Sequence, residues 1–368
     1  MRITGITWNY QSADSTGMIY FHGGNGLSFR LDHNTFQSAP NYGRYLWDNV
    51  PCVAPGCVID HNTITNVAAL VAAQLPSDGG DNFAGLTEWQ QAMKFDDGSE
   101  VYFEDNSFTF NNFFNNDMMD CSNGGRYVFR NNTVKGNLIF NHGYDSVAES
   151  CLEMTAYQNT IDGAGKAQAA VLYRGGTGVV YSNILKNAVQ KNFLVTNYRS
   201  NNSGQSNIHN PFCGGSNPID GNISNGWPCY QQIGRGSSSS TPGLALFPLY
   251  EWDNCKTNLG CTGTSDQVTI DVYNNQGGSV DHTFQDIVQN RDFYDSVASF
   301  KGDSGIGVGL VGDRPGTCTA LVAYWATDTS TLYQCSSKNT WTTYYTPYTY
   351  PHPLVSQSPP KGLKVQAH

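Results

Sequence analysis

Hydrophobic and polar residues alternate along this chain in short runs that return at regular intervals. One six-residue pattern, with asparagine fourth, occurs six times: LDHNTF (31–36), IDHNTI (59–64), FEDNSF (103–108), FRNNTV (129–134), AYQNTI (156–161) and VYSNIL (180–185). Successive asparagines are 28, 44, 26, 27 and 24 residues apart. β-Branched and aromatic runs at this interval predict one turn of a parallel β-solenoid for each copy.

The repeated asparagines are expected to lie above one another at a bend and to hydrogen-bond along the stack, as asparagines do in cross-β ladders. They are Asn34, Asn62, Asn106, Asn132, Asn159 and Asn183. LYEWDN (249–254) and DVYNNQ (271–276) read as degenerate copies.

Side chains alternate across a strand, so each copy has an inward and an outward set. The inward set includes Val101, Phe103, Tyr127, Phe129, Met154 and Ala156. The outward set forms two columns: Glu100, Arg126 and Glu153, and beside it Glu104, Arg130, Tyr157 and Tyr181. Opposite charges one turn apart predict exposed ion pairs. Arg130 is also a functional candidate, because its column ends in tyrosines.

The repeat resembles that of the right-handed parallel β-helix superfamily, the pectate-lyase-like fold, over roughly residues 1–295. The resemblance implies an all-β protein built as a right-handed parallel β-helix, here with loop excursions at about 66–93 and 200–243. That superfamily contains polysaccharide lyases, glycoside hydrolases, epimerases, phage tailspike depolymerases and inactive adhesins, so it does not select one activity.

Residues 296–368 differ in texture, with three β-like runs and many aromatic residues. We expect a small β-meander that caps the open end of the solenoid, because solenoids need capping for solubility. This tail resembles those of uncharacterised β-helix proteins from bacterial and phage sequences, which implies a secreted or virion-borne protein.

Composition narrows the possible partners. The 368 residues carry a net charge of −10, with 14% charged residues and 39 glycines. No run of five Lys or Arg occurs, so nucleic acid is not an expected partner. No stretch of eighteen apolar residues occurs, so no membrane span is expected. The start, MRITGITWN, lacks a signal-peptide pattern and begins at once with a strand pattern, as an excised piece of a longer protein would.

The ten cysteines favour disulfides and an oxidising setting: extracellular, periplasmic or virion. Pairs close in sequence are Cys52 with Cys57, Cys213 with Cys229, Cys255 with Cys261, and Cys318 with Cys335. Cys121 and Cys151 lie on neighbouring turns and are expected to pair. Buried free thiols are the alternative.

A second column of polar residues follows strand ends in IYFHGG (19–24), FFNNDMMD (113–120), LIFNHGYD (138–145) and VLYRGG (171–176). These place His22, Asp117, His142 and Arg174 at comparable positions. Glycine follows three of them, which turns the backbone and leaves the side chain exposed. Consecutive turns would then bring these groups together, unless they only cap turns.

This second column has the groups that β-elimination on a uronic-acid polymer needs. Arg174 or Arg130 would neutralise the carboxylate, His142 would take the proton, and Tyr144 or Tyr173 would protonate the leaving oxygen. A hydrolase would instead use two carboxylates, for which Asp117, Asp120 and Asp145 are available. Substrate contacts are expected from Glu153, Tyr157, Tyr181 and His22.

The sequence patterns that could indicate a metal site are weaker than the second column of polar residues. In FDDGSE (95–100), Asp96, Asp97 and Glu100 offer oxygen ligands for Ca²⁺, but the spacing is not a full calcium loop and an Asp-Gly turn is the alternative. His33 and His61 are expected to stack beside the asparagine ladder rather than bind zinc, which needs three or four ligands. No other cofactor is expected.

The sequence therefore predicts a secreted or phage-borne protein that acts on an acidic polysaccharide, as a lyase in the first instance. A glycoside hydrolase is one alternative. A non-catalytic carbohydrate-binding, adhesin or tailspike module is another, and a tailspike would imply a homotrimer.

Overall fold

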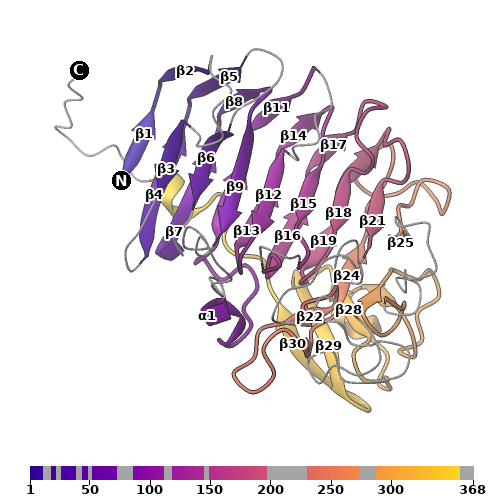
Figure 1. Cartoon of the computed structure of the whole chain (residues 1–368). Coiled ribbons are helices and arrows are strands. Elements are labelled where there is room, and N and C mark those ends of the chain that lie inside the picture. The colour runs from indigo at the N-terminus through magenta and orange to yellow at the C-terminus, as the bar shows by residue number, and fades with distance from the viewer. Residues whose placement is uncertain are drawn as a thin grey trace, which may run out of the picture.

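The computed structural model describes residues 1–10, 18–21, 26–38, 44–48, 52–72, 86–111, 118–144, 149–196, 230–273 and 287–356. Within these residues the regular secondary structure consists almost entirely of short strands, and the predicted all-β class is confirmed. Three long parallel sheets, here named A, B and C, stack strand upon strand from the N-terminus (Figure 1). None of the helices in the described part is long and apolar enough to span a membrane.

The chain passes through sheets A, B and C in turn, and each strand pairs with its counterpart from the next pass. Sheet A contains β1 (Arg2–Thr4), β4 (Leu27–Asp32), β7 (Cys52–Asp60), β10 (Val101–Glu104), β13 (Arg126–Arg130), β16 (Glu153–Tyr157), β19 (Val179–Tyr181), β24 (Leu249–Trp252) and β26 (Phe293–Tyr294).

Sheet B contains β2 (Thr7–Tyr10), β5 (Thr35–Ser38), β8 (Thr63–Thr65), β11 (Ser107–Thr109), β14 (Thr133–Lys135), β17 (Thr160–Asp162) and β20 (Ile184–Lys186). Sheet C contains β3 (Ile19–Phe21), β6 (Arg44–Asp48), β9 (Ala68–Ala72), β12 (Met119–Ser122), β15 (Ile139–Asn141), β18 (Val171–Tyr173), β21 (Phe193–Val195) and β25 (Asp271–Val272).

The core lies between the three sheets. The predicted inward residues of sheet A are buried there: Val101, Phe103, Tyr127, Phe129, Met154 and Ala156. Apolar residues of sheets B and C close the same core, among them Phe108, Val134, Ile139 and Val171. Burial of this continuous apolar surface is the main force that holds successive turns together.

The asparagine ladder is confirmed at the bend between sheets A and B. Asn106 donates from its main-chain and side-chain nitrogens to Oδ1 of Asn132, at 2.9 and 3.0 Å. The same pairing links each repeat asparagine to the next, from Asn34 to Asn254. The residue before each one is left-handed, with φ between 51 and 57°, and this sharp turn carries the chain into sheet B.

The segments predicted as loop excursions are only partly described. Residues 66–93 include β9, a strand of sheet C, and the single turn α1 (Leu86–Trp89), while 73–85 lie outside the described residues. Of residues 200–243, the described part begins at 230 and holds β22 (Arg235–Gly236), which pairs antiparallel with β23 (Ala245–Leu246).

The tail forms a four-stranded sheet and then a long extended segment. The sheet contains β27 (Ile306–Gly309), β28 (Ala323–Ala326), β29 (Thr331–Ser337) and β30 (Thr340–Tyr345), and the last three strands form the predicted meander. The short helix η1 (Val311–Asp313) follows β27. A cap over the open end is predicted from the sequence; the described tail packs on the outer face of sheet A, including its last strands β24 and β26.

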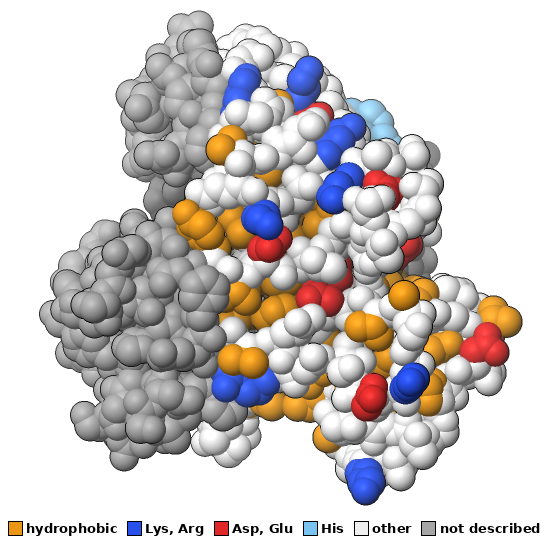
Figure 2. All heavy atoms as spheres, turned by 90° about the vertical axis from the view of Figure 1, so that its right-hand side faces the viewer, with side chains coloured by type: hydrophobic (Ala, Val, Ile, Leu, Met, Phe, Trp, Pro, Cys, Tyr) orange, Lys and Arg blue, Asp and Glu red, His pale blue; other side chains and the backbone are white. Residues whose placement is uncertain are grey.

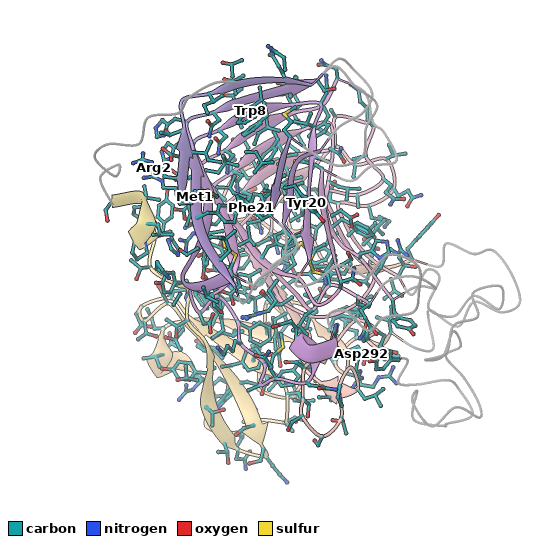
Figure 3. All side chains as sticks on the ribbon, turned by 60° about the vertical axis from the view of Figure 1, so that its left-hand side comes forward. Met1, Arg2, Trp8, Tyr20, Phe21 and Asp292 are labelled. Atoms are coloured by element: carbon teal, nitrogen blue, oxygen red, sulfur yellow. A yellow bond between two sulfur atoms is a disulfide. The ribbon has the colours of Figure 1, made fainter. Side chains whose placement is uncertain are left out.

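Residues 345–356, here called the strap, run back across sheet A toward the first strands and end in η2 (Pro353–Ser356) (Figure 1). The contact points follow the stack in reverse: Tyr345 contacts Tyr181 of β19, Tyr348 contacts Arg130 of β13, and Val355 contacts Arg30 of β4. Figure 3 shows the same C-terminal segment beside the labelled Met1 and Arg2.

Four of the expected disulfides are present: Cys52–Cys57, Cys121–Cys151, Cys255–Cys261 and Cys318–Cys335. Cys213 and Cys229 lie outside the described residues. The Cys121–Cys151 bond joins β12 to the residues just before β16, on neighbouring turns. Such bonds are compatible with an oxidising extracellular setting.

Candidate functional site

The outward column that contains Arg130 is enclosed. Arg130 Nη2 lies 2.7 Å from Glu104 Oε2, and both side chains are 0% exposed. The guanidinium also donates to the hydroxyl of Tyr157 and to the main-chain oxygens of Tyr348 and Thr349 in the strap. The surface position predicted for Arg130 is therefore wrong, and we assign this arginine no contact with substrate.

The tyrosines of the same column are also covered. Tyr157 and Tyr181 stack with ring centroids 4.8 Å apart, and Tyr181 stacks on Trp252 at 4.4 Å. Trp325 and Tyr345 of the tail pack over Tyr181. Outward alternation was correctly predicted, but these rings pack against the tail and do not form an open sugar-binding surface.

In the neighbouring column both carboxylates are buried and Arg126 is only 14% exposed, so its ion pairs are not the exposed ones predicted. Arg126 pairs with Glu100, which is 0% exposed. Glu153 is fully buried, and burial raises its pKa well above the ordinary value, with the nearby Glu100 carboxylate adding to this and Arg126 opposing it. A carboxyl in this position acts inside the structure and does not contact a polymer.

Of the acidic residues considered for Ca²⁺, Asp96 and Glu100 both accept from the hydroxyl of Tyr102, but the three do not form one cluster of ligand atoms. Asp96 accepts hydrogen bonds from the hydroxyls of Tyr102 and Tyr345. Asp97 accepts from the main chain of Ser99, and Glu100 pairs with Arg126. Among the described residues, the group of acidic, His or Cys ligand atoms close enough for one ion is Asp253, Cys255 and Cys261, and its two sulfurs form a disulfide.

Sheet C brings a histidine and an arginine together where β15 and β18 end. Asn141 and Tyr173 are register partners, so the next residues, His142 and Arg174, lie side by side on successive turns. Arg174 Nη1 is 3.5 Å from His142 Nε2, and its guanidinium lies 5.4 Å from the ring centroid of Phe140. His142 is partly exposed, whereas Arg174 is 7% exposed.

The tautomer of His142 follows from its other contact. Nδ1 lies 2.7 Å from the carbonyl oxygen of Gly143, which can only accept a hydrogen bond. The proton of the neutral ring is therefore on Nδ1, and Nε2 carries the lone pair beside Arg174. Gly143 is required here, because a Cβ at this position would lie 2.5 Å from the carbonyl oxygen of Arg174.

A buried layer supports these strand ends. Gln231 accepts from the main chain of Ser150 at 2.8 Å, and its own carbonyl accepts from Gly176 at 3.1 Å. Its side-chain amide also donates to Glu149. Burial raises the pKa of Glu149 to about 8, although the hydrogen bond from Gln231 opposes this shift. Glu149 is therefore mostly protonated at neutral pH.

Glu149 and Gln231 were not predicted from the sequence. Glu149 stands two residues before Cys151, which was expected to form a disulfide, so the sequence did offer a local signal for its position. Gln231 is 81 residues from Ser150 along the chain, and no repeat pattern places it there.

The predicted acids for the lyase lie deeper than expected. Tyr173 is 0% exposed and donates to the carbonyl of Met154 at 2.5 Å inside the core. Burial raises its pKa well above the ordinary value, with the Tyr127 and Glu153 charges adding to the shift. Tyr144 is 3% exposed and packs edge-on against Tyr230, at 5.3 Å between centroids.

Of the predicted carboxylates, Asp120 is described and is partly exposed. Its neighbour Met119 pairs with Ile139, which puts Asp120 level with Phe140, two positions before His142. His22, Asp117 and Asp145 lie outside the described residues. Figure 2 views the end of the stack near β21 and β25. Most of its basic side chains lie in the upper half of this view, and most of the apolar ones lie in the middle and lower half.

Comparison of the chain with protein-family models, with curated proteins and with solved structures found no match. The strand ends of sheet C therefore carry the functional proposal, through a guanidinium beside an imidazole whose proton position is fixed.

Proposed function

We propose that the chain is a right-handed parallel β-helix, in a secreted or virion-borne protein, that cleaves an acidic polysaccharide by β-elimination at the strand ends of sheet C. The observation that carries the proposal is the pairing of His142 Nε2 with Arg174 Nη1, 3.5 Å apart on successive turns. The repeated order of sheets A, B and C and the asparagine ladder support the β-helix.

Each group has a role in this reaction. The guanidinium of Arg174 pairs with the uronate carboxylate and stabilises the charge that develops when the neighbouring C5 proton leaves. Nε2 of His142 takes that proton, and the electrons of the C–H bond form the C4–C5 double bond while the C4–O bond breaks. The leaving oxygen takes its proton from solvent water, because Glu149, Tyr144 and Tyr173 are all buried.

The direct test incubates the protein with a panel of uronate polymers, with and without Ca²⁺, and follows the ultraviolet absorbance of the unsaturated product. We expect a signal that His142→Ala abolishes and that Lys135→Ala, on an exposed part of sheet B, leaves unchanged. New reducing ends without this absorbance would show a hydrolase and point to Asp120. Binding without either product would show a non-catalytic carbohydrate-binding, adhesin or tailspike module.

A homotrimer remains part of the tailspike alternative. Sedimentation equilibrium on the same preparation gives the mass, and a monomer would remove this alternative while leaving the lyase proposal intact.

A further inference from the structure

Two histidines outside the proposed active site form a stacked pair at the bend between sheets A and B. His33 and His61 lie on successive turns, with ring centroids 5.0 Å apart and ring planes 4° from parallel. Their side chains are 58% and 43% exposed. Both residues have the left-handed conformation, with φ of 54° and 55°, so the two rings leave the chain in the same direction.

A buried carboxylate orients each ring. His33 Nδ1 lies 2.9 Å from Oδ2 of Asp32, and His61 Nδ1 lies 2.9 Å from Oδ2 of Asp60. A carboxylate that accepts from Nδ1 places the proton of the neutral ring on that nitrogen. Nε2 of each ring then carries a lone pair at the exposed edge.

Arginines hold both carboxylates in place. Arg2 binds Asp32 through two nitrogens at 2.7 Å, and Arg30 binds Asp60 at 2.9 and 2.7 Å. The same carboxylate–imidazole unit therefore occurs twice, one turn apart. In metal sites this unit fixes the tautomer and direction of a ligating imidazole and raises its basicity.

We propose that His33 and His61 together bind one divalent transition-metal ion, Cu²⁺, Ni²⁺ or Zn²⁺, through their Nε2 atoms, with water as the other ligands. Imidazole suits these ions, while Mg²⁺ and Ca²⁺ prefer oxygen. Two nitrogens at about 2.0–2.1 Å from one ion lie roughly 3–4 Å apart. The rings are 4° from parallel, so each must turn toward the other before both Nε2 lone pairs point at one ion.

The next position of the same column adds no third nitrogen. Asp105 follows His61 on the next turn, and its Oδ1 accepts a hydrogen bond from Tyr350 at 2.8 Å. The site is therefore a two-histidine site, and the bound ion acts as a clamp between the turns that begin with β5 and β8.

Equilibrium titration of the purified chain with Cu²⁺ and with Zn²⁺ tests the site, together with the nitrogen splitting in the electron paramagnetic resonance spectrum of the Cu²⁺ form. We expect one ion per chain, two coordinated nitrogens, and at least a tenfold loss of affinity in His33→Gln and in His61→Gln. His142→Gln, which removes another partly exposed imidazole, should bind as the unchanged chain does.

Thermal melting of the metal-free variants separates loss of the site from loss of the fold, and exposed Gln side chains should leave the melting temperature within a few degrees. Undiminished binding in the folded double variant would overturn the proposal by placing the ion elsewhere. So would loss of only one of the two nitrogens in that variant, or no binding by the unchanged chain at millimolar metal.

Discussion

Arg130 and Glu104 form an ion pair that links three parts of the chain. They are register partners on β13 and β10, and the guanidinium lies 2.7 Å from the carboxylate. The strap provides further hydrogen-bond partners for both side chains. The main-chain oxygens of Tyr348 and Thr349 accept from Arg130, and the main-chain nitrogen of His352 donates to Glu104. A pair predicted on the surface is thus the point where the tail is fixed to the stack.

Arg130→Met should destabilise the protein by about 3–5 kcal/mol, because it leaves the buried carboxylate of Glu104 without its cation. The matched control is Lys135→Met, at an exposed position of β14. Urea denaturation followed by circular dichroism measures both. A loss below about 1 kcal/mol in Arg130→Met would show that the strap does not enclose the pair in solution.

Asn132→Ala should cost about 2–4 kcal/mol, because the main-chain nitrogen of Asn106 would lose its acceptor in a buried bend and the carbonyl of Phe103 would lose the Asn132 amide that donates to it. Thr133→Ala changes the exposed residue beside it and is the control. Chemical denaturation should show a change of less than about 1 kcal/mol in the control. Equal losses in both would contradict the ladder.

Glu149 should make stability depend on pH. Its pKa is raised from the ordinary 4.5 to about 8 in the folded state, so the folded protein holds a proton that the unfolded chain releases. This contribution is fully present below about pH 4.5 and is lost as the pH rises through about 8. Glu149→Gln should flatten the fall in unfolding free energy over that window, measured by denaturation at several pH values. An unchanged slope would mean that Glu149 is ionised in the fold.

Arg174→Gln should weaken binding of uronate oligosaccharides by about tenfold or more, because a hydrogen bond to a charged group contributes roughly 1.5–3 kcal/mol. Neutral oligosaccharides of the same length should bind both proteins alike. Calorimetry with the two ligand classes makes the comparison without relying on turnover. If binding of uronate and of neutral oligosaccharides weakened equally, Arg174 would stabilise the fold of the strand end and would not recognise the carboxylate of the ligand.

The inward half of the stack could be predicted from the sequence because its signals are local. Period-two alternation placed Phe103 and Tyr127 in the core, and the spacing of the asparagines predicted the ladder. The same alternation places Tyr173 inward once Arg174 is taken as outward. The burial of Tyr173 could therefore have been predicted, and with it the exclusion of this residue as the catalytic acid.

The outer face of sheet A could not be predicted in the same way. Alternation shows that Arg130 points away from the stack, but it does not show what lies there. The covering residues Tyr348 and Thr349 are 218 and 219 positions further along the chain, and no repeat connects them. The buried layer behind His142 has the same difficulty, because Gln231 comes from outside the regular turns.

The strap also changes how such a stack should unfold. In a repeat protein each unit contacts its neighbours only, so the ends can fray while the middle stays folded. Here Arg30 on the second strand of sheet A donates to Val355, 325 positions away, and Arg130 is tied to the same segment. Separate turns therefore share one partner and should melt in a single transition. The same contacts raise the mean sequence separation of native pairs, so folding should be slow and finish only when the last residues have docked.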